Sequence, residues 1–128
     1  MWQYRRKCKY IHARLIKRLK RVFEGGVKIA FGSDIMVDID NEMRGTVALS
    51  YIDSFVEAEI PASDILKIMT VNAAQLLGIE KARGTIAGGM FCDLIATEEN
   101  PLENIMTLKT VLFVMKNGVV YKNNKNNR

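Results

Sequence analysis

The sequence is poor in the residues that form metal centres and disulfides. Its 128 residues include one histidine, His12, and two cysteines, Cys8 and Cys92. The cysteines lie far apart and lack the spacing of metal ligands, so we expect two free thiols in a reduced, cytoplasmic protein. A metal site that activates water needs three or more protein ligands. With one histidine, few imidazole ligands are available for such a site.

Long apolar runs are also absent. No stretch approaches the roughly 20 apolar residues that cross a bilayer, so no membrane span is expected. Hydrophobic residues make up 48% of the chain, as in globular proteins. At 128 residues the chain has the size of one domain. It is too short for a complete (β/α)₈ barrel, which needs about 250 residues.

Positive charge is concentrated in the first part of the chain. Residues 1–28 contain ten lysines and arginines and one acid, Glu24. The remaining residues contain nine basic and thirteen acidic side chains. The net charge of +5 therefore belongs to the first segment, and the rest of the protein is mildly acidic.

An amphipathic helix is predicted over residues 4–24, ending at Gly25 and Gly26. Its apolar residues recur at steps of three and four, and its other face is basic. Such a face suits nucleic-acid phosphates, an anionic membrane or an organelle-targeting segment. A charge run on a helix is most often its solvated face, so nucleic acid is not the expected partner. His12 lies among these basic residues, and we expect neither a ligand nor a catalytic role for it.

Residues 26–34 read as a short strand with functional groups at its end. Val27, Ile29 and Phe31 alternate with other residues, which predicts the strand. Ser33 and Asp34 follow at its carboxyl end, where α/β folds collect ligands and catalytic groups. A carboxylate there is suited to bind a metal, act as a general base or cap the next helix. The stretch alone favours a cap or turn.

The loop that follows is acidic. Asp38, Asp40 and Glu42 alternate, but Gly45 comes too late for the turn of an EF-hand, and no calcium loop is predicted. We interpret the segment as a polar loop at the mouth of a site. The candidates for substrate contact are Ser33, Met36 and Asp38.

Two helices and three short strands are predicted after this loop. The helices cover residues 43–59 and about 61–77, the second beginning at Pro61 and ending at Gly78. Ile60 cannot cap this helix, which weakens its start by about 1 kcal/mol. The strands cover residues 93–97, 111–115 and 119–121, and an Asn-Gly turn joins the last two.

Four motifs occur in a characteristic order: GVKIAFGSD at 26–34, TVNAAQLLGI at 70–79, GTIAGGMFCDLI at 84–95 and NPLENI at 100–105. Together they resemble the carboxy-terminal part of metal-dependent amidohydrolases. The closest resemblance is to the imidazolonepropionase-like and metal-dependent prolidase-like members. It covers about residues 22–121, most of this chain but only the tail of such an enzyme.

The resemblance implies an α/β fold in two parts. Residues 1–83 would form the carboxy-terminal fragment of a (β/α)₈ barrel, as a helix, a strand and further helices. Residues 84–122 would supply the carboxy-terminal strands of a small β-sandwich, and residues 123–128 a polar tail. The amino-terminal portion of the barrel is then a missing partner. Because strand edges would stay open without it, we expect self-association of the isolated chain.

The resemblance also implies a chemistry. The complete enzyme would hydrolyse a C–N bond in a small cyclic amide or dipeptide-like substrate. Asp34 falls on the family's metal ligand and proton acceptor, the metal being a divalent ion such as zinc. Asn72 falls in an Asn-Ala-Ala signature, where we expect structural hydrogen bonding, and Asp93 reads as structural.

This chain departs from the family in one main respect. The family's His-x-His pair and further histidines have no counterparts here, so we expect the isolated chain to bind no cofactor and to be inactive. In smaller departures, Ser33 stands where threonine is usual and Cys92 where alanine is usual. The alternative is a small non-enzymatic protein whose basic helix binds nucleic acid or another chain.

Overall fold

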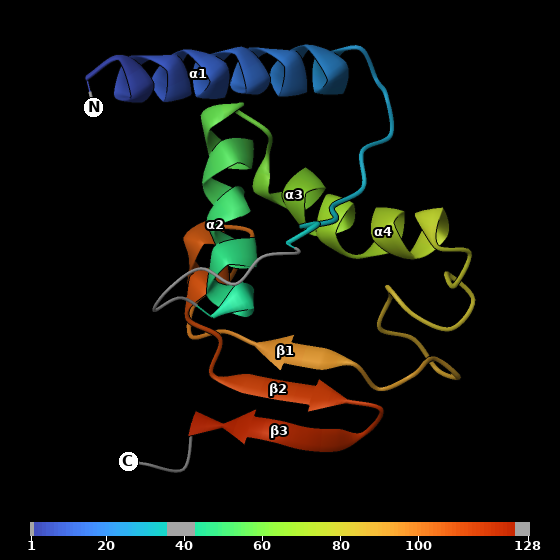
Figure 1. Ribbon diagram of the computed structural model, residues 1–128. Helices are drawn as coiled ribbons and strands as arrows, with labels where there is room; N and C mark the ends of the chain where they lie inside the picture. Colours follow the sequence, from blue (N-terminus) through green and yellow to red (C-terminus); the bar gives the residue numbers. More distant parts are fainter. Residues whose placement is uncertain (1, 36–42, 125–128) are drawn as a thin grey trace.

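The computed structural model describes residues 2–35 and 43–124, with the side chains of the first helix described from His12 onward. The fold mixes helices with a small sheet (Figure 1). In chain order the elements are α1 (Trp2–Glu24), α2 (Arg44–Glu57), α3 (Ala62–Met69), α4 (Val71–Leu76), β1 (Leu94–Ala96), the 3₁₀ helix η1 (Ile105–Lys109), β2 (Phe113–Lys116) and β3 (Val119–Asn123).

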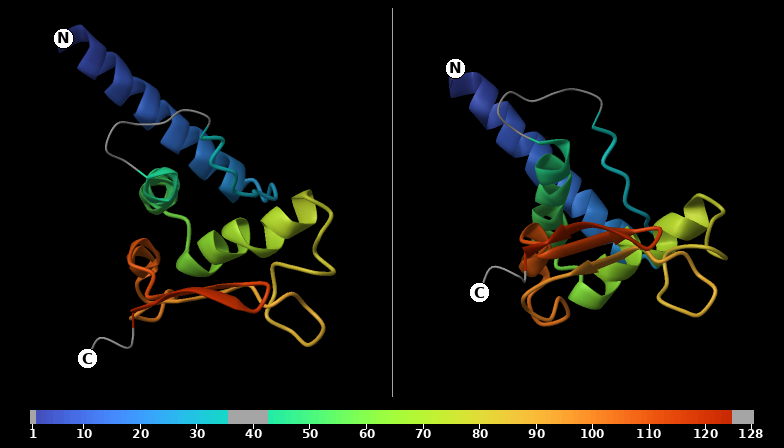
Figure 2. Two further views of the ribbon diagram at one scale, coloured as in Figure 1. Left: turned by 60° about the horizontal axis from the view of Figure 1, so that its bottom comes forward. Right: turned by 90° about the horizontal axis from the view of Figure 1, so that it is seen from below.

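The core lies between α2, α3 and η1. α1 crosses the carboxyl end of α2, and the sheet lies at the opposite end of the molecule (Figures 1 and 2). Ile52 and Ile65 are fully buried at the centre of the core. Half-buried residues of α1 pack against this core at its edge. The buried cluster contains Ile52, Phe55, Ala58, Ile60, Ile65, Ile68, Ile105 and Leu108.

α1 ends as the sequence predicts, at the glycine pair. Gly26 has a φ of 71°. Its N–H donates to the Phe23 carbonyl at 2.9 Å, and the Val27 N–H donates to the Val22 carbonyl at 3.2 Å. This pair of hydrogen bonds is a Schellman motif, in which glycine is favoured because it has no Cβ.

α2 ends with the same motif but without glycine. Glu59 takes the left-handed position with a φ of 59°. Its N–H donates to the Val56 carbonyl at 2.9 Å, and the Ile60 N–H donates to the Phe55 carbonyl at 3.1 Å. This turn delivers Ile60 into the core, where it is 4% exposed. Pro61 is the N-cap of α3 and makes no side-chain cap, as expected of an Ile-Pro start.

Glu59→Gly is expected to stabilise the protein by about 0.5–1 kcal/mol, because an L-residue at this φ costs about 1–2 kcal/mol and the flexibility of glycine offsets part of the gain. The substitution removes the ion pair between Glu59 Oε2 and Lys20 Nζ, 2.6 Å apart, but Glu59 is 74% exposed and such pairs contribute little. Urea denaturation of Glu59→Gly, with Glu59→Gln as the control that removes only the ion pair, measures the difference. A less stable Glu59→Gly would show that the ion pair outweighs the backbone strain.

The predicted helix over residues 61–77 is wrong in one respect, because it is broken into α3 and α4 at Thr70. Thr70 has φ −124° and ψ −85°. Beside the break, the Ile68 carbonyl accepts a hydrogen bond from the Phe31 N–H at 3.0 Å. That carbonyl is therefore engaged outside the helix. Leu76, the last residue of α4, is 75% exposed.

The predicted strand over residues 26–34 is also wrong, because residues 27–35 have no regular secondary structure. A strand requires a neighbouring strand to receive its backbone hydrogen bonds. Here the Phe31 N–H meets a carbonyl of α3 instead. Asn72 Nδ2 donates to the Ile29 carbonyl at 2.8 Å, which confirms the hydrogen-bonding role expected of Asn72. The segment is thus attached to the helices and not to a sheet.

The three predicted strands are confirmed, with ends shifted by one or two residues. They form an antiparallel sheet in the order β1-β2-β3, with an irregularity between Val114 and Met115. Asn117 and Gly118 both have positive φ, 51° and 78°, as a type I′ hairpin turn requires. β3 is the last strand in the sheet order and is exposed along its whole length. Within the described residues its outer edge therefore has no neighbouring strand, as expected. No helix in the described part of the chain has the length and apolarity to cross a membrane.

Candidate functional site

Asp34 lies near the end of the irregular segment 27–35 that follows α1. Its φ of 46° is in the left-handed region, which asparagine and aspartate tolerate better than most residues. The residue is exposed, and Ser33 beside it is half-buried. Within residues 2–35 and 43–124 the Asp34 carboxylate has no hydrogen bond or ion pair. A strained backbone with an unpaired carboxylate is a pattern found at functional sites.

The other sequence candidates are not gathered around Asp34. Met36 and Asp38 lie outside the described residues. His12 Nε2 is 2.8 Å from Glu57 Oε2, and both side chains are 52% exposed. The chain's one histidine is thus engaged with the end of α2, and the expectation that it is not a ligand stays a prediction.

The donor set of the described residues does not fit a complete metal centre. Among residues 2–35 and 43–124, no three His, Cys, Asp or Glu side chains are positioned to hold one ion. Cys92 is a free, exposed thiol whose Sγ lies 3.3 Å from Met115 Sδ. Asp34 is therefore not grouped with other potential ligand side chains among the described residues.

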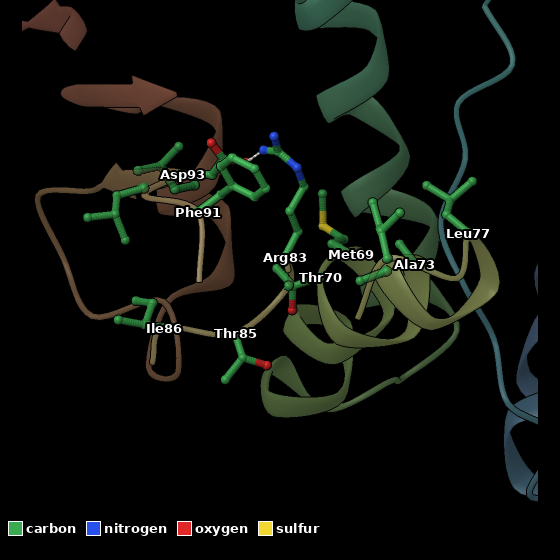
Figure 3. Close-up of a pocket in the computed structure, with 14 residues that line it drawn as sticks. Met69, Thr70, Ala73, Leu77, Arg83, Thr85, Ile86, Phe91 and Asp93 are labelled. Carbon is green, nitrogen blue, oxygen red and sulfur yellow. Dashed lines mark hydrogen bonds and ion pairs between the residues drawn. The ribbon is translucent and has the colours of Figure 1, made fainter. Parts of the chain in front are cut away.

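A mainly apolar pocket of about 390 Å³ lies between α4, β1 and the connection that joins them (Figure 3). Thr70, Thr85, Arg83 and Asp93 are the polar side chains of its wall. Several apolar residues at the pocket are exposed, including Leu77 at 69% and Ile86 at 84%. The remaining lining residues are Met69, Ala73, Ala74, Ile79, Gly84, Phe91, Leu94 and Ile95.

Arg83 joins the pocket to the hairpin. Its Nη1 donates to Asp93 Oδ2, and its Nη2 donates to Asn117 Oδ1 at 2.9 Å. Asp93 Oδ1 accepts from the Asn117 N–H at 2.8 Å, and the Arg83 guanidinium lies 4.3 Å from the centre of the Phe91 ring. The structural interpretation of Asp93 is confirmed. Arg83 was not singled out in the sequence, since its partners lie 10 and 34 positions away and no local pattern connects them.

The amidohydrolase family model matches residues 9–121, and the chain belongs to this family. The family assignment made from the four sequence motifs is therefore confirmed.

Two curated relatives and one solved structure show the same relationship. The chain is 31% identical over 83 residues to a 5'-deoxyadenosine deaminase of Methanosarcina barkeri, covering 61% of this chain and 19% of that protein. It is 28% identical over 85 residues to a 5-methylthioadenosine/S-adenosylhomocysteine deaminase of Halothermothrix orenii, covering 62% and 20%. A Xaa-Pro dipeptidase with methionine bound in its active site matches with a TM-score of 0.74 and 36% identity, over 84% of this chain and 25% of that one.

The chain corresponds to only part of each of these three proteins. The chain spans about a fifth of the length of these curated relatives and a quarter of the solved structure. The mixed helix-and-strand fold is that of the corresponding part of an amidohydrolase. Activity is a property of the whole relatives, each of which is several times longer.

Proposed function

We propose that this chain is the carboxy-terminal part of a metal-dependent hydrolase of C–N bonds, to which it contributes Asp34 as a metal ligand and proton acceptor. The observation that carries the proposal is the state of Asp34. It has an exposed carboxylate, no partner among the described residues and a left-handed backbone, which aspartate tolerates at a lower cost than most residues.

The packing before Asp34 supports the role, because it holds the backbone in place. The Phe31 N–H bonds to α3 and the Ile29 carbonyl accepts from Asn72 at the start of α4. The Phe31 ring also packs against Phe55, with centroids 6.0 Å apart. Three residues before Asp34 the chain is thus attached to the core. A ligand held by a rigid base loses little entropy when it binds.

The metal is proposed to be a divalent ion, zinc in the first instance. When bound, such an ion supplies a water whose pKa is lowered to near neutrality. The Asp34 carboxylate provides one oxygen ligand and a place for the proton. The other ligands come from outside the described residues, so the isolated chain is expected to bind zinc weakly and to be inactive.

The two-part architecture is proposed on the same basis. Residues 1–83 form the end of a (β/α)₈ barrel, residues 84–122 the carboxy-terminal strands of a β-sandwich and residues 123–128 a tail. The open edge of β3 and the apolar walls of the pocket support this division, because both are surfaces that further polypeptide would cover. The remaining barrel segment is the expected partner.

The substrate is proposed to be a small cyclic amide or a dipeptide-like molecule. The identity to the Xaa-Pro dipeptidase, 36%, is the highest of the three given above, so Xaa-Pro dipeptides are the first compounds to assay. The second compound to assay is 5'-deoxyadenosine, because the Methanosarcina barkeri relative is named for it. The complete protein is expected to hydrolyse either Xaa-Pro dipeptides or 5'-deoxyadenosine, and not both.

The first test is the mass of the protein in its source cells, detected with an antibody against residues 84–122. We expect a band several times larger than the 14.5 kDa of this chain, because the proposed enzyme needs its other metal ligands in the same polypeptide. A band at 14.5 kDa would contradict an enzyme built from one chain.

A further inference from the structure

The basic side chains on the two sides of α1 differ in whether they have carboxylate partners. On the side facing the core, Ile16, Leu19 and Phe23 are half-buried and pack against it. The basic residues flanking that side have carboxylate partners: His12 meets Glu57 at 2.8 Å, and Lys20 meets Glu59 at 2.6 Å. The hydrogen bond to Glu59 raises the pKa of Lys20 above its ordinary value. Lys20, a cation beside the packed side, therefore has a carboxylate partner.

The opposite side of α1 is not compensated. Four cations there recur at steps of three and four residues, which places them on one helix face. We call this the outer face of α1. All four side chains are exposed, and within the described residues none forms an ion pair. Glu24, at the end of the helix, is the one acid in α1. The outer face consists of Arg14, Lys17, Arg18 and Arg21.

We propose that the outer face of α1 binds the phosphate backbone of nucleic acid. Arg14 and Arg21 are separated by about 10 Å along the helix axis, at 1.5 Å per residue. Duplex DNA carries one phosphate charge per about 1.7 Å of its axis, so four cations over that length meet several phosphates at once. Arginine suits this role because its planar guanidinium forms two parallel hydrogen bonds with a phosphate.

The distribution of charge supports a specific orientation. Residues 1–28 carry ten basic residues and one acid, whereas the rest of the chain has more acids than bases. A polyanion would therefore be repelled by the body and attracted to α1. In Figure 1, α1 lies along one side of the molecule, away from the sheet. Among the described elements, none covers the outer face in this arrangement.

A membrane is the less favoured partner. A helix that lies on a bilayer needs an apolar face to insert. The apolar face of α1 packs against the core, and only Leu15 and Val22 are more than a third exposed on its described part, at 54% and 40%. The outer face carries charge alone. Among the side chains of α1 that the structure describes, from His12 to Glu24, the outer face presents no aromatic ring for base stacking, so the binding is expected to be independent of sequence.

The test uses the 128-residue chain and a fluorescently labelled random-sequence duplex of about 20 base pairs, with binding followed by anisotropy. If the outer face makes four phosphate contacts, the affinity should fall roughly 100-fold between about 50 and about 200 mM salt. Replacing Arg14, Lys17, Arg18 and Arg21 together by glutamine should lower the affinity at least about 10-fold at the lower salt. Glutamine keeps the helix propensity, and circular dichroism checks the helix.

The matched control removes the same number of charges elsewhere, with Lys28, Lys67, Lys81 and Lys116 replaced by glutamine. It should lower the affinity less than about threefold. A third variant, Arg14→Lys, Arg18→Lys and Arg21→Lys combined, keeps the charge and should keep most of the binding. Equal losses in the two glutamine variants would overturn the proposal, because net charge alone would then explain the binding. Absence of binding at low salt would overturn it, as would binding to vesicles rich in phosphatidylserine but not to the duplex.

Discussion

Asp34→Asn is expected to lower the hydrolytic activity of the protein purified from its source cells by about 10²–10⁴-fold. The substitution, introduced in the chromosomal gene, preserves the size of the side chain and its tolerance of a left-handed backbone. It removes the negative charge that, in the proposed function, holds a metal ion or a proton. The measurement is kcat/KM with Xaa-Pro dipeptides, together with the metal content of the purified protein. Both are expected to fall.

Asp34→Gly separates the catalytic role from a role in the turn. Glycine accepts a φ of 46° without strain, so the free energy of unfolding of the 128-residue chain should rise by about 0.5–1 kcal/mol in urea denaturation. Activity of the complete protein should nevertheless be lost. If Asp34 served only the turn, glycine would keep the activity, and that result would contradict the proposed function.

Asp53→Asn is a suitable control for the loss of a carboxylate. Asp53 is on α2, and its two oxygens each lie 2.7 Å from Lys109 Nζ, so its charge already has a partner. Its neutralisation should leave activity within about threefold and lower stability by less than about 1 kcal/mol. A loss of activity equal to that of Asp34→Asn would show that general charge balance, rather than a ligand at position 34, governs the enzyme.

Local signals explain which parts of the fold were predictable. The glycines after α1 and the Asn-Gly pair between β2 and β3 determine backbone angles by themselves, and both features are confirmed. The break at Thr70 and the irregular segment over residues 27–35 lie beside the same tertiary contact. The hydrogen bond from the Phe31 N–H to the Ile68 carbonyl joins residues 37 positions apart in sequence. No periodicity within either segment carries that information.

The same reasoning applies to the candidate site. Asp34 was found because a sequence motif surrounds it, and its role as ligand and base stays a prediction. The Arg83 interactions were not found, since Asp93 and Asn117 approach Arg83 only when the hairpin folds back on the loop. The pairing of His12 with Glu57, 45 positions away, was equally invisible. Clusters formed by tertiary packing leave no trace in residue spacing.

Gly84→Ala is expected to be strongly destabilising, by about 3 kcal/mol. Gly84 has a φ of 95°, and a Cβ there would lie 2.7 Å from Ala74 Cβ and 3.2 Å from the Thr70 carbonyl oxygen. Backbone strain contributes about 1–2 kcal/mol and forced overpacking about 1–3 kcal/mol. Ala74 is 5% exposed and belongs to α4, so it cannot move aside without shifting the helix. Urea denaturation of the 128-residue chain measures the loss.

Gly88→Ala is the matched control in the same connection. A Cβ at Gly88 would meet no atom within 4 Å, and its φ is outside the left-handed region. Its effect should be within about 0.5 kcal/mol, or slightly stabilising because alanine restricts the unfolded chain. Equal effects of the two substitutions would show that the connection moves freely over α4, and the pocket walls would then not be fixed relative to each other.

The double variant Gly84→Ala with Ala74→Gly tests the cause of the loss. Ala74→Gly alone should cost about 1 kcal/mol, because it places glycine inside α4. In the double variant the clash between the two Cβ atoms is absent, whereas the backbone strain at position 84 and the 3.2 Å contact with the Thr70 carbonyl oxygen remain. We therefore expect a favourable coupling of about 1–2 kcal/mol between the substitutions. Strict additivity would assign the whole loss to the backbone strain and the Thr70 contact, and the approach to Ala74 would contribute nothing to the loss.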